Sequence, residues 1–308
     1  MIKDVTKPND ILLVGEILID IITTKNEKKH MFGGSPANIT INLKKLGFTP
    51  YLCATIGNDD YGKFLNNVLQ AENLSLKFIR RSNKPTSIVE LNQTKDTPTP
   101  TFKRQADKDI ILSEKLRNHL KNSKILHFTY WPLNDKPARD TINTLIQIAQ
   151  DENVLIGFDP NFHSALTTDK ENAINTIKDT FKKVDIIKPS LDDSKRIFGP
   201  DLTPEAYMEH YESYNIDLII LTLGKDGILV SYRKQRFSFH SMADEVVDAT
   251  GAGDAFWSGL YGGLLTNHDI KEACIIGSIC SAYNLKQVGA LTNLPTINTL
   301  MNRLKEEQ

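Results

Sequence analysis

The chain has 308 residues, of which 40% are hydrophobic and 24% charged, and its 37 Lys and Arg are balanced by 38 Asp and Glu. A chain of this size and composition buries a large core and folds as one large α/β domain or two smaller ones. The balanced charge gives no reason to expect nucleic acid or an anionic membrane as a partner.

The cysteines and the apolar runs indicate where in the cell the protein is located. Cys53, Cys274 and Cys280 are too few and too widely spaced for a disulfide framework or a Cys-x-x-Cys metal site. The N-terminal MIKDVTKPND has no apolar signal region, and no apolar run approaches the roughly 20 residues that span a bilayer. We therefore expect a soluble, cytoplasmic protein with no membrane partner.

The first apolar run, from Ile11 to Val14, ends at Gly15 and is typical of a strand buried on both faces of a parallel sheet. The apolar pattern continues over residues 16–22 but includes Glu16 and Asp20. Because an unpaired buried carboxylate is costly, Asp20 either points to solvent or faces ligand hydroxyls that satisfy it. The run by itself favours exposure to solvent.

A helix is predicted to start at Ser35-Pro36 and to stop at Gly47, because apolar residues recur at positions 37, 39, 41, 43 and 46. Gly33 and Gly34 precede it and would let the backbone pass close to a bound molecule. Asn38 would point toward that molecule from the first turns of the helix.

The chain then alternates between strand-like and helix-like segments. A second strand and helix are expected at 51–56 and 61–69, a half-exposed strand at 86–91 and a loop at 96–100. Further strands and helices follow in turn, which is the rhythm of a parallel sheet with crossover helices. These later segments are 125–128, 137–149, 154–158, 173–181, 185–187, 218–221 and 275–285.

The segment at 246–265, VVDATGAGDAFWSGLYGGLL, is interpreted as an extended stretch, a glycine turn and a helix. The first helical turn has amides without internal partners and the positive end of the helix dipole, so the Gly251-Ala252-Gly253 amides are suited to an anion. Asp254 would stand beside that anion as a general base for phosphoryl transfer. Alternatively, Asp254 merely caps the helix and the glycines allow tight packing.

Three motifs in order resemble the PfkB, or ribokinase-like, family of carbohydrate kinases, and most of all its fructokinases and ketodeoxygluconate kinases. They are GGSPAN at 33–38, GNDDYG at 57–62 and DATGAGD at 248–254. The resemblance implies one domain over residues 1–308, an α/β three-layer sandwich with a mostly parallel central sheet. It also implies a small lid sheet from residues 16–30 and 86–105, which covers the sugar and pairs two subunits as a homodimer.

The resemblance further assigns roles to individual residues. It implies ATP and Mg²⁺, with K⁺ as an additional ion, and a small sugar as acceptor, most similar to fructose. The catalytic group is Asp254 with Gly251, Ala252 and Gly253, and the substrate-binding group is Asp20, Gly33, Gly34, Asn38, Arg104 and Asp159. The nucleotide-binding group is Lys188, Ser190, Thr222, Gly224, Gly227 and Ser278, with Asp193 acting on Mg²⁺ indirectly and Asp248 near the monovalent cation.

Some of these assignments have plainer alternatives. Arg104 could equally be a solvated surface arginine. The alternative for residues 222–227 is an ordinary strand-to-turn junction. His163 stands where the family's DPN segment usually has Arg, and Ala249 replaces the usual Thr, Pro or Ser. Ser190 and Asp193 are shorter than the family's Asn and Glu, so their action on Mg²⁺ would pass through water.

A sensor function and other acceptors remain open at this point. The replacements at 163, 190 and 193 motivate a non-catalytic sugar or nucleotide sensor, and the intact DATGAGD motif argues against it. Ketodeoxygluconate, ribose and nucleosides are alternative acceptors. A Walker-type ATPase is disfavoured because no GxxxxGK[ST] loop is present.

Overall fold

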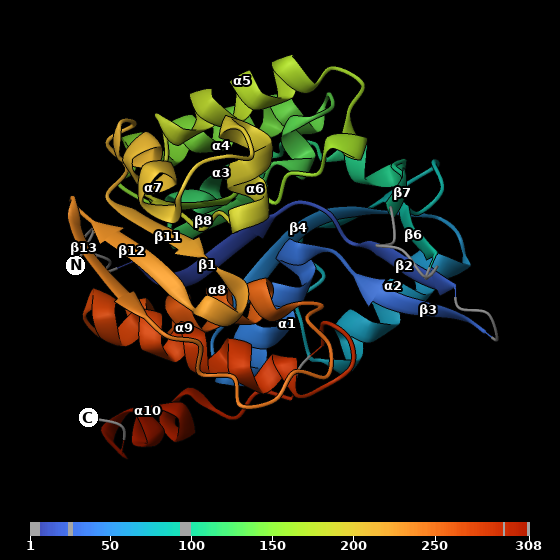
Figure 1. The fold of residues 1–308 in the computed structure, drawn as a ribbon. Helices are drawn as coiled ribbons and strands as arrows, with labels where there is room; N and C mark the ends of the chain where they lie inside the picture. The colour runs from blue at the N-terminus through green and yellow to red at the C-terminus, as the bar shows by residue number, and fades with distance from the viewer. Residues whose placement is uncertain (1–6, 24–26, 93–99, 292, 307–308) are drawn as a thin grey trace.

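A computed structural model describes residues 7–23, 27–92, 100–291 and 293–306. The loop predicted at 96–100 lies, except for Pro100, outside these residues. Within them, a large sheet runs through the middle of the molecule and helices cover both of its faces (Figure 1). The predicted α/β class with a mostly parallel central sheet is confirmed.

The large sheet is parallel from β11 to β5 and ends in two antiparallel strands, β12 and β13. In spatial order its strands are β13 (Gln235–Phe239), β12 (Ile228–Tyr232), β11 (Leu218–Thr222), β10 (Ile186–Ile187), β9 (Leu155–Asp159), β8 (Ser123–Thr129), β1 (Asn9–Val14), β4 (Pro50–Gly57) and β5 (Ile79–Ser82).

Two hydrophobic clusters, one on each face of this sheet, hold the helices in place. One face packs α1 (Ser35–Leu46), α2 (Asp60–Ala71), α8 (Ala252–Leu265), α9 (Ile270–Leu285) and α10 (Ile297–Glu306). The other packs α3 (Glu114–Lys121), α4 (Ala138–Asp151), α5 (Lys170–Phe181), α6 (Leu191–Phe198) and α7 (Pro204–Glu212).

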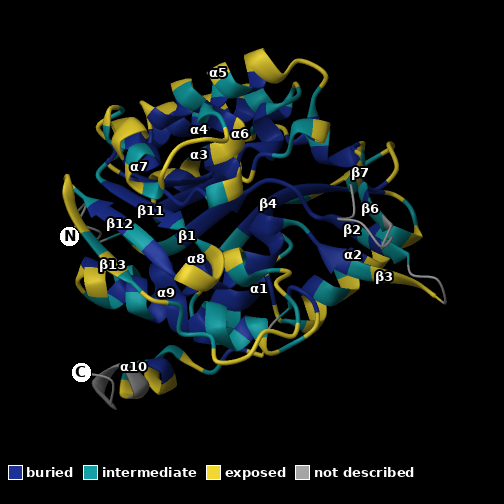
Figure 2. Cartoon of the chain, in the orientation of Figure 1, coloured by how far each residue is buried: buried dark blue, intermediate teal, exposed yellow. Residues whose placement is uncertain are grey.

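The burial pattern follows from these layers. Residues 11–14 of β1 are fully buried, as expected for a parallel strand covered on both faces. Figure 2 shows the central strands in dark blue and the exposed residues on the outer helices and at the edges. The continuous apolar runs in the sequence therefore correspond to buried central strands.

A second, smaller sheet stands at one end of the molecule and is called the lid sheet here. Its strand order is β3-β2-β6-β7, with β2 and β6 parallel and the outer pairs antiparallel. The strands are β2 (Leu18–Thr23), β3 (Lys28–Gly33), β6 (Ile88–Asn92) and β7 (Pro100–Lys103). β2, β6 and β7 fall within the two segments predicted for a small sheet, 16–30 and 86–105, whereas β3 starts in the first segment and extends beyond it to Gly33.

The two helices nearest the predicted site begin as the sequence indicated. Pro36 occupies the first turn of α1, and Gly47 ends that helix with φ 102°, a left-handed C-cap. The segment before α8 differs from the prediction, because residues 240–251 form no strand and Val246 and Val247 are 65% and 52% exposed. No helix among the described residues is long and apolar enough to cross a membrane.

Candidate active site

A cavity of about 360 Å³ opens where the central strands end and the helices α1 and α8 begin. Ligands of open α/β sheets gather at such carboxyl ends of strands. Segments far apart in the sequence therefore contribute to one space. Its lining residues are Asp20, Ser35, Asn38, Asp159, Asn161, Lys188, Ser190, Asp193, Thr222, Thr250, Gly251, Gly253, Asp254 and Ala290.

Asp254 lies in the first turn of α8, and both of its carboxylate oxygens accept hydrogen bonds from α1. The Ser35 hydroxyl donates to Oδ1 at 2.6 Å, and the Asn38 amide donates to Oδ2 at 2.9 Å. Burial raises the pKa of Asp254 to about 6, and the two hydrogen bonds oppose that rise. At neutral pH the carboxylate is therefore mostly ionised and able to accept a proton.

Asp20 of β2 faces the same cavity, so exposure to bulk solvent, which the apolar run favoured, is not what the structure has. Burial, and secondarily the charge of Asp254, raise the pKa of Asp20 to about 7. Gly33 leaves room for this carboxylate, because a Cβ at Gly33 would overlap Asp20 Oδ2. The backbone pairing of β2 with β3 thus fixes where Asp20 points, whereas the sequence run alone did not.

Asp159, at the end of β9, is held by two donors on one oxygen. Lys188 Nζ lies 3.1 Å from Asp159 Oδ2, and Trp257 Nε1 donates to the same oxygen at 2.7 Å. Asp159 and Lys188 are 5% and 4% exposed. Lys188 also lies close to Gly253. The ammonium group is therefore positioned at the α8 end of the cavity, where an anion would meet it.

The backbone of the α8 turn supplies amides at that point. Gly251 has φ 82°, and a Cβ there would stand 2.6 Å from Ala290 Cα, so only glycine fits. The Ala252 amide already bonds the Ala249 carbonyl at 3.3 Å. Within the described part of the chain, the amides of Gly253 and Asp254 have no acceptor. Of the three amides predicted to be unpaired, Ala252 is therefore paired within the described residues, and Gly253 is joined by Asp254.

A second cavity of about 510 Å³ adjoins the first, because Thr222 and Gly253 line both. Its walls are mostly apolar and come from β11, β12, the 240–252 segment, α8 and α9. Four of the residues predicted to bind a nucleotide line it, namely Thr222, Gly224, Gly227 and Ser278. The exposed Val246 is also part of its wall, so this cavity accounts for an apolar side chain outside the core.

Ser190 and Asp193 form the N-terminal capping box of α6. Asp193 accepts from Ser190 N and Oγ with one oxygen, and from Phe162 N with the other. Burial, and secondarily Asp159, raise the pKa of Asp193. Both carboxylate oxygens thus have protein donors, so the structure favours a helix-capping function for this residue. The described residues contain no cluster of three His, Cys, Asp or Glu able to hold a metal ion.

Asp248, predicted near a monovalent cation, closes the turn that leads into α8. Its Oδ1 accepts from the Thr250 amide and hydroxyl at 2.9 and 2.8 Å, and its Oδ2 accepts from Gly289 N at 2.8 Å. These bonds lower the pKa of Asp248 against the opposing effect of burial, which is the largest single contribution. Asp248 therefore connects the α8 turn to the turn at Gly289.

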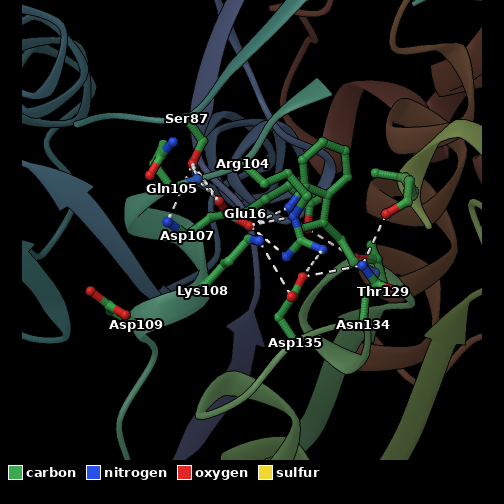
Figure 3. A network of polar contacts seen from close by, with 12 residues as sticks. Glu16, Ser87, Arg104, Gln105, Asp107, Lys108, Asp109, Thr129, Asn134 and Asp135 are labelled. Carbon is green, nitrogen blue, oxygen red and sulfur yellow. Dashed lines mark hydrogen bonds and ion pairs between the residues drawn. The ribbon is translucent and has the colours of Figure 1, made fainter. Parts of the chain in front are cut away.

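Arg104 is predicted to bind the substrate, with a solvated surface arginine as the alternative, and that alternative does not hold because Arg104 is 8% exposed. Its Nε and Nη2 donate to Asp107 Oδ2, its Nη1 donates to Asp135 Oδ2 at 2.9 Å, and it stacks on Trp131. Figure 3 shows this network and the neighbouring Lys108. Arg104 does not line the cavity beside Asp254, so it is a buried, paired arginine that the structure keeps apart from the other predicted substrate residues.

Glu16 lies beside Arg104 and Thr129 (Figure 3) and is 2% exposed. Its Oε2 accepts from the Thr129 hydroxyl at 2.9 Å, and its Oε1 accepts from the Ser35 amide at 3.4 Å. Burial raises the pKa of Glu16 to about 8, opposed by hydrogen bonds from its own backbone amide and the Thr129 hydroxyl and by the positive charge of Arg104. Glu16 thus links the β8 end to the start of α1.

His163, which replaces the arginine expected after the DPN segment, caps a short turn. Its Nδ1 accepts from Ala165 N at 3.1 Å, and its ring centroid lies 5.4 Å from that of Phe102. Burial, and secondarily Arg196, lower the pKa of His163. The imidazole is therefore mostly neutral at pH 7 and does not replace the positive charge of an arginine.

The structure gathers most of the predicted residues and adds some that the sequence reasoning missed. Gly33, Gly34, Arg104 and Asp248 do not line either cavity, although Gly33 and Gly34 immediately precede the lining residue Ser35. Ser35 had a signal in the sequence, because it stands three positions before Asn38 in the same motif and so belongs to the same helical face. Thr250 and Ala290 line the first cavity without such a signal.

Comparisons with known proteins show the family to which the chain is similar. The model of the pfkB family of carbohydrate kinases matches residues 8–297. An ATP-dependent 6-phosphofructokinase of Thermoanaerobacterium thermosaccharolyticum is 44% identical over 301 residues, covering 96% of this chain and 93% of that one. The fructokinase of Escherichia coli is 24% identical and covers 92% of this chain and 95% of its own.

Solved structures extend the likeness to the fold. The fructokinase of Halothermothrix orenii shares 30% identity with a TM-score of 0.78, covering 91% of this chain and 99% of its own. A fructokinase of Vibrio cholerae, solved with fructose, ADP and potassium, shares 23% identity with a TM-score of 0.84, covering 97% and 99%. The chain belongs to the pfkB family of carbohydrate kinases, phosphotransferases that act on a sugar hydroxyl.

Proposed function

We propose that this protein transfers the γ-phosphoryl group of ATP to a primary hydroxyl of a fructose-based sugar, with Asp254 as the general base. One juxtaposition carries the proposal. A carboxylate with a pKa of about 6 stands in the first turn of α8, beside the unpaired amides of Gly253 and Asp254. A base and an anion site in one cavity are the two groups that phosphoryl transfer needs side by side.

The proposed reaction forms one bond and breaks another. The acceptor oxygen bonds to the γ-phosphorus as its proton passes to the Asp254 carboxylate. The bond between that phosphorus and the β–γ bridging oxygen breaks, and ADP leaves with the electron pair. The amides at Gly253 and Asp254 and the ammonium of Lys188 would stabilise the negative charge of the migrating group.

The acceptor and the nucleotide would enter from opposite sides of this point. Asp20, Asn38, Gly34 and Asp159 would fix the sugar hydroxyls, which matches the presence of Asp20, Asn38 and Asp159 in the lining of the first cavity. The base and ribose of ATP would occupy the second cavity, with its apolar walls and the residues Thr222, Gly224, Gly227 and Ser278.

The ions implied by the reaction fit the residues present only in part. Mg²⁺ commonly keeps several waters and binds substrate phosphates, so it needs no dedicated protein cage. It would neutralise phosphate charge, with Asp193 acting through water because both oxygens of Asp193 already accept protein hydrogen bonds. K⁺ would lie near Asp248, whose carboxylate organises the adjoining turns.

Fructose 6-phosphate is the first candidate acceptor. The 44% identical relative carries the name 6-phosphofructokinase, whereas the likenesses to proteins named fructokinase are weaker. A sugar phosphate needs cations beyond the transfer site, and the lid strand β3 carries Lys28, Lys29 and His30 on exposed positions. Free fructose, the acceptor expected from the motifs, is the second candidate. It is favoured by the cavity itself, where Lys188 is the one cation among the described lining residues.

A coupled assay of ADP release decides between the two acceptors. Purified protein with ATP, Mg²⁺ and K⁺ is supplied with fructose 6-phosphate, fructose, ketodeoxygluconate, ribose and adenosine in parallel. We expect the largest kcat/KM with fructose 6-phosphate, and Asp254→Asn is the matched inactive control. A larger kcat/KM with fructose would make the protein a fructokinase, and ATP turnover with none of the five would favour the sensor.

Two further proposals concern the setting of the enzyme. We propose that it acts in the cytoplasm and that two copies pair through the lid sheet, whose outer strands β3 and β7 each have one paired neighbour. Sedimentation of the purified protein should give the mass of a homodimer. A monomer at micromolar concentration would contradict pairing through the lid.

A further inference from the structure

Ser35 is the first residue of α1 and one of two donors to the carboxylate of Asp254. It is 7% exposed, and its hydroxyl donates to Asp254 Oδ1 at 2.6 Å. The other oxygen, Oδ2, accepts from the Asn38 amide at 2.9 Å. The side chain of Asp254 is therefore fixed in direction by two residues from the first turns of the same helix.

The two donors differ in what else they contact. Asn38 has a buried Oδ1 that lacks a hydrogen-bond partner among the described residues, so a sugar hydroxyl that donates to this oxygen can turn the side chain away from Asp254. Ser35 is anchored from its other end, because its backbone amide donates to Glu16 Oε1 at 3.4 Å. The hydrogen bond from Ser35 can therefore persist while the one from Asn38 is released.

We propose that Ser35 is a positioning residue for phosphoryl transfer: its hydroxyl holds Oδ1 of Asp254 so that Oδ2 is presented to the acceptor hydroxyl. The inference rests on the proposed function, since it requires Asp254 to act as the base. Holding one oxygen of the carboxylate leaves the other with a single direction, which is how supporting hydrogen bonds preorganise a catalytic group.

The charge environment gives this role a measurable consequence. Burial raises the pKa of Asp254, and the hydrogen bonds from Ser35 and Asn38 lower it. The charged groups facing Asp254 come from β9 and from the segment after β10, where Asp159 raises its pKa and Lys188 lowers it. On β2, Asp20 faces it as a third carboxylate. Removing the Ser35 hydroxyl leaves all of these charges in place, so Asp254 should protonate at a higher pH.

The experiment measures kcat/KM from pH 5 to pH 9 for the wild type and Ser35→Ala. The acid limb of the Ser35→Ala profile should move up by about one pH unit, because a hydrogen bond to a charged group has a free energy of that size. Relative to the wild type, activity should fall about fivefold at pH 6 and stay nearly equal at pH 8.5. The KM for ATP should stay unchanged.

Two further variants control for a merely structural effect. Ser35→Thr retains the hydroxyl and should restore the acid limb. Ser258→Ala removes the same group from α8, where the hydroxyl donates to the backbone carbonyl of Asp254 at 2.7 Å instead of to the carboxylate. Its acid limb should coincide with that of the wild type.

The outcomes separate this inference from the proposed function. If the wild type is active and Asp254→Asn is not, an unmoved acid limb in Ser35→Ala overturns the positioning role alone. A loss that is equal at every pH does the same, because it indicates a structural role. Should Ser35→Ala fail to fold, Ser35→Cys keeps the side-chain volume with a weaker donor, and an unmoved limb in that variant overturns the inference.

Discussion

Two clusters of charged side chains lie close together in this protein. They differ in how far positive charges balance their carboxylates. Around the cavity, the carboxylates of Asp20, Asp159 and Asp254 face one another, and among the described lining residues Lys188 is the one cation. In the neighbouring network, Arg104 and Lys108 are matched by Asp107 and Asp135.

The difference appears in the groups that surround the carboxylates. Burial, and secondarily the charge of Asp254, raise the pKa of Asp20 to about 7; burial raises the pKa of Asp254 to about 6, and the hydrogen bonds from Ser35 and Asn38 and the charge of Lys188 oppose that rise only partly. In the second cluster, Asp107 accepts five hydrogen bonds from described residues and its charge is paired with Arg104. An uncompensated cluster leaves donors and acceptors for a ligand, and a compensated one holds the fold.

The largest expected effect is that of Asp254→Asn, which removes the proposed base while keeping the shape of the side chain. We expect kcat to fall at least ~10²-fold, the low end for general-base catalysis, with a modest change in ATP affinity. Steady-state kinetics and nucleotide binding measure the two quantities. Near wild-type turnover would remove Asp254 from the role and would make the first cluster no more catalytic than the second.

A substitution in the Arg104 cluster should lower the stability of the fold, because it leaves a buried charge without its partner. Asp107→Asn removes the carboxylate that pairs with Arg104 at 2.6 Å, and we expect the free energy of unfolding to fall by about 3 kcal/mol. Urea denaturation measures it. The matched control is Asp179→Asn, because the pair of Asp179 with Lys182 is exposed and its loss should change the free energy of unfolding far less. Equal losses of the free energy of unfolding in the two variants would mean that burial of the Arg104 network does not add to its contribution to stability.

Asp20→Asn tests the substrate side of the first cluster. We expect the KM for the sugar to rise about tenfold, because a hydrogen bond between a charged carboxylate and a hydroxyl is lost, while the KM for ATP stays nearly constant. Initial rates at varied sugar and fixed ATP give both constants. A fall in kcat with an unchanged sugar KM would contradict a binding role for Asp20.

Glu16→Gln tests how Glu16 contributes to the pH dependence of stability. Burial raises the pKa of Glu16 to about 8 from an ordinary value near 4.5. The folded state therefore binds this proton more tightly, and the stability from Glu16 is fully present below the unfolded pKa and is lost as pH rises through the folded one. Unfolding in urea from pH 5 to pH 9 should show the free energy of unfolding of Glu16→Gln gaining on that of the wild type, by on the order of 4 kcal/mol.

A matched exposed residue supplies the control for that pH dependence. Glu114 has 79% of its side chain exposed, and Glu114→Gln should keep a constant difference from the wild type above pH 6. A difference between Glu16→Gln and the wild type that does not change with pH would mean that Glu16 titrates as an ordinary surface carboxyl. Glu16 would then not share the raised pKa of the carboxylates around the cavity.

Local structure and the motif positions could be predicted from the sequence because they depend on short-range chemistry. The bounds of α1 followed from a proline in its first turn and a left-handed glycine after its last. The start of α8 followed from the glycine turn, and the central strands from their apolar runs. Family membership followed from three motifs, and the comparisons confirmed it.

Only the tertiary structure decided how side chains pair, because pairing depends on which segments the packing brings together. Ser35 meets Asp254 across 219 positions of sequence, and no local pattern records that contact. Arg104 is buried because Asp107 and Asp135 neutralise it, and Asp135 stands 31 positions away, although an arginine near a loop is usually solvated. Asp20 faces the cavity because β2 pairs with β3 and β6 in one register, whereas its apolar run fits either direction.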